Sequence, residues 1–111
     1  MARGGYLGEL EQIVMLAVAR LEGEAYGMSI RREIEQRTGR DVAIGAVYST
    51  LERLQAKGYV DAAAPAGADT RDGRARRFFQ LTRIGTDALD AAAEMQTRMW
   101  SGLRLKKAGR R

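Results

Sequence analysis

The spacing of the apolar residues changes at Gly58, and this change limits the folds open to the chain. Up to Gly58 they recur every three or four residues, as they do along one face of an α-helix. Residues 59–64 and 76–81 then read as two short strands around a polar turn. Helical spacing returns after Thr82. The pattern predicts a mainly α-helical chain with one small β-hairpin.

Three amphipathic helices are expected before the hairpin. The first spans residues 7–21, and the second opens at Tyr26-Gly27 and ends at Thr38-Gly39, where glycine suits a helix C-terminus. The third runs over residues 44–57 and buries a stripe made of Val47, Leu51 and Leu54. We predict that the positions facing outward, away from that stripe, are Ala46, Ser49, Thr50 and Arg53.

The hairpin carries a cluster of arginines around Gly73, namely Arg71, Arg74, Arg76 and Arg77. Residues 70–111 hold 11 basic and 4 acidic side chains, whereas residues 1–69 hold 8 and 10, so the formal charge of +5 comes from the second half. Four like charges in seven residues repel one another unless an anion lies near. The phosphate backbone or minor groove of DNA is the expected partner, and a solvated basic cluster is the alternative.

Strand alternation places Phe79 and Leu81 on one face of the second strand, with Phe78 and Gln80 on the other.

The chain contains neither cysteine nor histidine. It therefore has no disulfide, no thiolate or imidazole metal ligand and no Ser-His or Cys-His nucleophile. We expect no catalytic activity, no cofactor and no metal. No stretch approaches the roughly 20 apolar residues of a membrane span, and no secretion signal is evident, so we expect a cytoplasmic protein without membrane contact.

The last helix is too long for the domain that precedes it. Thr82 suits its N-cap, although Gly85 would weaken its first turn. From Thr82 to about Leu105 the helix would measure about 36 Å, whereas an 80-residue core has a radius of gyration of only about 12 Å. The overhanging part needs a second apolar surface, most simply the same helix of another copy. The predicted dimerisation stripe is Leu89, Ala92, Met95, Met99 and Leu103.

Helix, helix, turn, helix and a hairpin with a basic tip are the order of a winged helix-turn-helix, whose third helix enters the major groove. We therefore expect a winged DNA-binding domain over residues 1–81, a C-terminal dimerisation helix over residues 82–107 and a basic tail over residues 108–111. The hydroxyls of Ser49 and Thr50 would approach DNA closely, and Arg53 would reach a guanine or a phosphate. The alternatives are plain solvent exposure of both hydroxyls and a salt bridge of Arg53 with Glu52 or Glu33.

Several segments resemble the PadR family of bacterial transcription regulators. Residues 26–30 (YGMSI), 45–54 (GAVYSTLERL) and 57–60 (KGYV) look like the core signature of the family, and residues 73–85 look like its wing signature. The resemblance covers residues 7–90 and implies a winged-helix homodimer that usually represses transcription from a palindromic operator. It adds to the DNA-binding candidates Tyr26, Gly45 and Tyr48.

The two tyrosines have a second interpretation, because Tyr26 and Tyr48 could equally be core residues whose hydroxyl emerges at the surface. Ala46 departs from the family pattern, since a threonine is usual there. Two other functions stay open. One is a regulator gated by a small aromatic effector bound at the dimer axis, where the candidate ligand residues are Gln96, Met99 and Trp100. The other is a winged-helix module for protein interaction.

Overall fold

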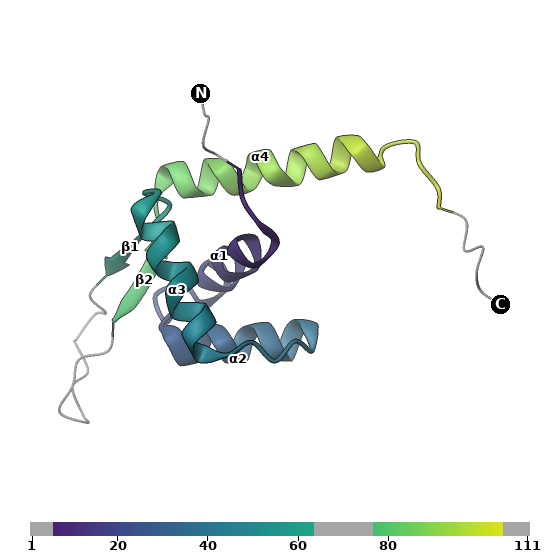
Figure 1. Ribbon diagram of the computed structural model, residues 1–111. Helices are drawn as coiled ribbons and strands as arrows, with labels where there is room; N and C mark the ends of the chain where they lie inside the picture. The colour runs from purple at the N-terminus through teal and green to yellow at the C-terminus, as the bar shows by residue number, and fades with distance from the viewer. Residues whose placement is uncertain (1–5, 64–76, 106–111) are drawn as a thin grey trace.

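The computed structural model describes residues 6–63 and 77–105. The described chain contains four helices and a two-stranded antiparallel hairpin (Figure 1). In chain order they are α1 (Glu9–Leu21), α2 (Gly27–Thr38), α3 (Ile44–Ala56), β1 (Val60–Ala63), β2 (Phe78–Leu81) and α4 (Arg83–Trp100). The predicted fold class is confirmed. Three of the predicted wing arginines lie outside the described residues: Arg71, Arg74 and Arg76.

Helices α1, α2 and α3 pack against one another around a single apolar core. Its largest fully buried side chains include Met15 from α1, Ile30 and Ile34 from α2, and Leu51 and Leu54 from α3. The predicted end of α2 is confirmed, because Gly39 caps it at a φ of 78° and donates its N–H to the Glu35 carbonyl. Packing against α1 and α2 thus holds α3 in a fixed position at the surface.

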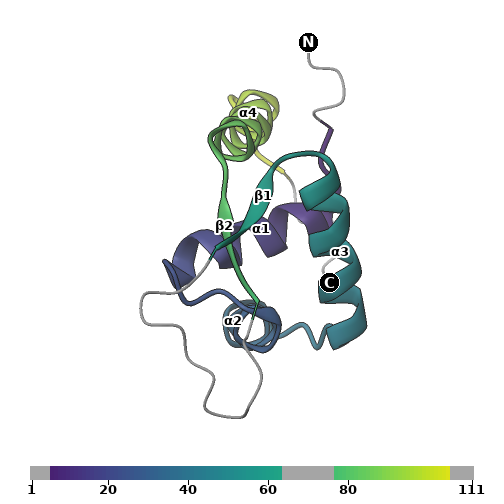
Figure 2. The same ribbon diagram turned by 90° about the vertical axis from the view of Figure 1, so that its left-hand side faces the viewer.

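The hairpin lies beside α1 and runs toward the start of α2 (Figure 2). Its register pairs Val60 with Leu81 and Ala62 with Phe79. Phe79 also donates its backbone N–H to the Ala25 carbonyl at 2.9 Å, which ties β2 to the segment between α1 and α2. Both Phe78 and Phe79 are buried, although strand alternation places them on opposite faces of β2. The Phe78 and Tyr26 rings pack edge to face, with their centroids 5.5 Å apart.

The start of α4 is anchored to the turn between α3 and β1. The Thr82 hydroxyl accepts a hydrogen bond from the Gly85 N–H at 3.0 Å, as predicted for an N-cap, and donates to the Gly58 carbonyl at 2.6 Å. Gly85 is buried against the Tyr59 carbonyl, and a Cβ at this position would overlap that oxygen. The glycine is therefore required by close packing of α4 against the domain.

Helix α4 is shorter than the sequence suggests. It ends at Trp100, and Ser101-Gly102 form a turn in which Gly102 has a φ of 76°. Eighteen residues give a helix of about 27 Å. The predictions of a helix to about Leu105, and of Leu103 on its stripe, are wrong because a left-handed glycine stops the helix first. Even so, α4 extends well past the rest of the domain in Figure 1.

Candidate nucleic-acid interface

The outer face of α3 is open to solvent and carries little charge. Its exposed residues are Gly45, Tyr48, Ser49, Glu52, Arg53 and Ala56. Glycine, serine and alanine are small enough to let DNA bases come close to the helix, while Glu52 is able to accept a hydrogen bond from a cytosine amino group. This face has the shape and chemistry of a helix that enters a major groove.

Two of the predicted outward positions on α3 are wrong. Thr50 is fully buried, and Ala46 is half-buried against the core. The reason is that α3 packs against α1 on one side and α2 on the other. Its buried face is therefore wider than the stripe of Val47, Leu51 and Leu54 indicates. The open face is rotated toward Gly45 and Glu52, and Ser49 is the small hydroxyl that remains on it.

Arg53 lies at the edge of this face, turned toward α1. Its Nη2 donates to the Thr50 hydroxyl at 3.2 Å, and its Nε lies 3.6 Å from Oε2 of Glu11. Arg53 therefore forms its ion pair with Glu11 of the first helix, and not with Glu52 or Glu33 as the alternative had it. Glu33 instead pairs with Arg20 of α1 and Arg37 of α2.

Glu11 is the centre of a charged cluster that joins the start of α1 to the end of α3. Its carboxylate accepts hydrogen bonds from Lys57 Nζ at 2.9 and 3.0 Å and from the Gly8 N–H at 2.9 Å. Only 9% of its side chain is exposed. Burial alone raises the pKa of the Glu11 carboxyl, but the Gly8 N–H, Lys57 and Arg53 outweigh burial and lower the pKa below its ordinary value.

The cluster predicts an acid-sensitive contribution to stability. The pKa of Glu11 is lower in the folded chain than in the unfolded chain, so the ionised carboxylate stabilises the fold. This stabilisation is fully present above the ordinary glutamate pKa of about 4.3. It is lost as the pH falls through the pKa that Glu11 has in the folded chain. Glu11→Gln should lower the free energy of unfolding near neutral pH by about 1–3 kcal/mol and flatten its decline in acid. Urea unfolding from about pH 7 to about pH 3 measures both effects.

Glu9→Gln is the matched control, because Glu9 lies on the same helix but is 79% exposed in its pair with Arg40. Its stability should stay within about 0.5 kcal/mol of the unchanged protein. An acid decline as steep in Glu11→Gln as in the unchanged protein would show that another group carries the effect.

The two tyrosines lie at the junction of α2 and α3. Tyr26 is half-buried: its ring packs on Phe78, and its hydroxyl accepts a hydrogen bond from Arg32 at 3.2 Å. The Tyr48 ring lies so close over Gly27 that a Cβ there would overlap the phenol, yet 41% of Tyr48 is exposed. Each ring thus packs against the domain, as the second interpretation has it, and contact of either tyrosine with DNA stays a prediction.

Arg77 marks the hairpin side of the interface. It is exposed, its Nη2 donates to the Gln55 side-chain oxygen at 3.2 Å, and its guanidinium lies 5.2 Å from the centre of the Phe79 ring. These contacts hold a cation of the hairpin next to the last turn of α3. Together, Arg77 and Arg53 place a positive charge on each side of the open helix face.

The sequence patterns did not assign Glu11 or Gln55 to this region, and Glu52 entered only as an alternative salt-bridge partner of Arg53. The local position of Glu11, three residues after Gly8, accounts only for its bond to the Gly8 N–H, because Arg53 lies in α3 and Lys57 directly follows that helix. Glu52 was discoverable from spacing alone, since it lies seven residues after Gly45, two helical turns along the same face. Only the folded chain reveals the contact between Gln55 and Arg77.

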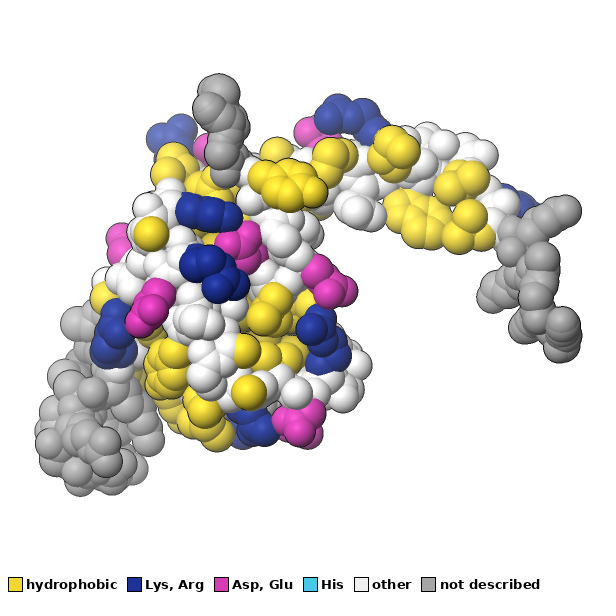
Figure 3. Space-filling view, in the orientation of Figure 1, with side chains coloured by type: hydrophobic (Ala, Val, Ile, Leu, Met, Phe, Trp, Pro, Cys, Tyr) yellow, Lys and Arg dark blue, Asp and Glu magenta, His cyan; other side chains and the backbone are white. Residues whose placement is uncertain are grey.

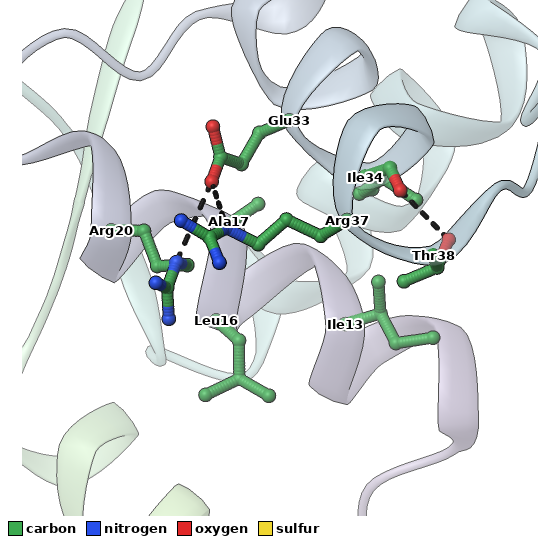
Figure 4. A pocket seen from close by; sticks show the side chains of 8 residues that line it. All are labelled: Ile13, Leu16, Ala17, Arg20, Glu33, Ile34, Arg37 and Thr38. Atoms are coloured by element: carbon green, nitrogen blue, oxygen red, sulfur yellow. Dashed lines mark hydrogen bonds and ion pairs between the residues drawn. The ribbon is translucent and has the colours of Figure 1, made fainter.

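A pocket of about 200 Å³ lies between α1 and α2 (Figure 4). It is lined by Ile13, Leu16, Ala17, Arg20, Glu33, Ile34, Arg37 and Thr38. The charged part of the pocket lining is made by Glu33 and two arginines. Glu33 Oε2 accepts a hydrogen bond from Arg37 Nε at 2.7 Å and forms an ion pair with Arg20 Nε at 3.5 Å. The lining includes none of the predicted effector residues, which are the α4 residues Gln96, Met99 and Trp100.

The predicted dimerisation stripe on α4 divides into two parts. Leu89 and Ala92 are half-buried, and Leu89 packs against the core. Met95 is 52% exposed, Met99 75% and Trp100 52%. Figure 3 shows hydrophobic side chains on the part of α4 that extends beyond the three-helix domain. Exposed apolar surface of this kind is typical of association surfaces. None of the described helices is long and apolar enough to cross a membrane.

Solved structures with similar folds include transcription regulators. RosR from H. salinarum is 26% identical, with 88% of this chain and 81% of that chain covered at a TM-score of 0.63. A PadR family regulator from Clostridium difficile is 25% identical, with coverages of 78% and 88% and a TM-score of 0.60. One from Eggerthella lenta, at 22% identity, coverages of 85% and 81% and a TM-score of 0.65, shows the same fold.

A search of curated protein sequences found no match. The family model of the PadR-like transcriptional regulators, in contrast, matches residues 15–91, which is more than half of the chain. The matched segment runs from α1 through the hairpin into α4, and so includes the open face of α3. By this match, the chain belongs to the PadR-like family of transcriptional regulators.

Proposed function

We propose that this regulator is a homodimeric repressor that binds an inverted-repeat operator. The observation that carries the proposal is the open, nearly uncharged face of α3 with a cation at each side, Arg53 toward α1 and Arg77 toward the hairpin. Bases would be read by Ser49 and Glu52 in the major groove, while arginines contact phosphates. The division into a DNA-binding domain of residues 1–81 and a dimerising C-terminal region belongs to the same proposal.

Dimerisation supplies the symmetry of the operator. The exposed Met95 and Met99 at the end of α4 pair with the same residues of a second copy, and the two α3 helices then face one side of the duplex. Half-sites about 34 Å apart, one turn of DNA, follow from such a dimer. Arg71, Arg74 and Arg76 of the hairpin, together with the half-buried Tyr26 and exposed Tyr48, contact the adjacent backbone.

Selection of binding sites from random duplexes, followed by titration of the selected duplex in increasing salt, tests the proposal. We expect an inverted repeat and a fall in affinity of about ten-fold or more between about 50 and 200 mM salt, because arginine–phosphate contacts release counterions. Enrichment of no sequence, or an affinity independent of salt, would contradict DNA recognition. Enrichment of a single half-site would contradict the proposed dimerisation but leave DNA recognition standing.

A further inference from the structure

The charged cluster around Glu11 treats its two cations differently. Lys57 Nζ donates to both carboxylate oxygens of Glu11 and to the Tyr6 carbonyl at 3.3 Å, so its three protons all have acceptors. Lys57 is therefore engaged in holding α3 to α1. Its side chain is 33% exposed, compared with 55% for Arg53.

The guanidinium group of Arg53, in contrast, has only some of its N–H groups engaged by the protein. A guanidinium has five N–H groups. Within the described part of the chain, Nε faces Glu11 and one Nη2 proton is donated to Thr50. The three other N–H groups have no protein acceptor among the described residues, and the side chain, which belongs to the exposed side of α3, is 55% exposed. That arrangement suits a phosphate, which arginine binds through paired N–H groups.

We infer that Glu11 is a positioning residue for DNA binding, whose buried carboxylate fixes Arg53 so that its outer N–H groups clamp a phosphate beside α3. The inference rests on the proposed function. A free arginine side chain loses much rotamer freedom when it is immobilised. Arg53 has already lost part of this freedom to Glu11 and Thr50, so less is lost when DNA binds.

Glu11→Gln gives opposite results under positioning and under simple electrostatics. The amide keeps the size of the side chain but removes a negative charge, and so raises the net charge of the protein. Long-range attraction alone would then strengthen DNA binding. Positioning predicts instead that affinity for the selected duplex falls about five-fold, and that the slope of log K against log salt becomes shallower by about 0.9, the loss of one phosphate contact.

The matched control is Glu9→Gln, which removes the same charge from the same helix without touching Arg53. It should bind DNA as tightly as the unchanged protein, or slightly more tightly. A double-mutant cycle adds a readout that a general loss of stability would not reproduce. In an Arg53→Ala background, Glu11→Gln should cause no further loss of affinity or of salt slope.

Arg53→Lys tests the same clamp without disturbing the buried carboxylate. Lysine keeps the charge, but it lacks the planar fork that reaches Glu11, Thr50 and a phosphate together, so affinity should fall to a similar extent. Circular dichroism establishes that each variant is folded.

Equal behaviour of Glu11→Gln and Glu9→Gln on the selected duplex, or an undiminished effect of Glu11→Gln in the Arg53→Ala background, would overturn the inference and leave the proposed function standing. If the unchanged protein bound no duplex, the proposed function would fail and this inference with it. A weaker, shallower Glu11→Gln titration that disappears in the Arg53→Ala background is the result we expect.

Discussion

Gly85→Ala is expected to lower the free energy of unfolding by about 3 kcal/mol, a large fraction of the stability of a chain of this size. The added Cβ would overlap the backbone oxygen of Tyr59. That oxygen also accepts the Thr82 N–H at 3.0 Å, so it cannot move away without loosening the start of α4. Because the obstacle is backbone and not a mobile side chain, no change of rotamer relieves it. Urea unfolding of the variant and the unchanged protein measures the difference.

Gly45→Ala is the matched control for this prediction. Gly45 lies in the first turn of α3, and a Cβ there would meet nothing within 4 Å. Alanine at this position should raise the free energy of unfolding by about 0.5–1 kcal/mol, because it has the higher helix propensity. A small effect of Gly85→Ala, comparable in size to that of Gly45→Ala, would show that α4 is not held as tightly against the turn between α3 and β1 as described.

Met95→Glu combined with Met99→Glu is expected to raise the dissociation constant of the proposed dimer by about 100-fold or more, because each substitution would place a charge in the proposed apolar contact. Both residues lie on the end of α4 that extends past the domain, so the fold of the protomer should be retained. Light scattering measures the oligomeric state. Affinity for the inverted repeat should fall in parallel, since one half-site binds more weakly than two joined ones.

Thr97→Glu provides the comparison for the charge itself. Thr97 is exposed on the opposite side of α4 and is one turn or less from both methionines in sequence. This variant should remain a dimer with nearly unchanged DNA affinity. A dimer that survives Met95→Glu and Met99→Glu together would mean that a different surface joins the two copies.

Much of the fold follows from the sequence because its signals are local. The 3.6-residue periodicity, the glycines that end α2 and α3, and the threonine that caps α4 act within a few residues of one another. They predicted the order of elements and their bounds to within a few residues. The error at the end of α4 has the same local origin, since the apolar spacing continues past Trp100 while Gly102 ends the helix.

The candidate site was predicted less completely. Spacing identified α3 as the exposed helix, but the stripe of Val47, Leu51 and Leu54 did not reveal that Thr50 is also buried. A helix that packs against two other helices has a wider buried face than a helix that packs against one. How many helices pack against α3 is decided by the tertiary structure. Arg53 is exposed, as predicted, but the sequence did not reveal that it also reaches back to Glu11 of the first helix.

By itself, the sequence determined the class of the fold, the absence of thiol and imidazole chemistry, and the basic character of the second half of the chain. The tertiary structure alone decided which side of α3 is open, that Glu11 joins Arg53 and Lys57, and that Gly85 touches Tyr59. Periodicity and charge are properties of neighbouring residues along the chain. The contacts that orient α3 join residues from different elements, and they exist only once the helices and the hairpin have packed together.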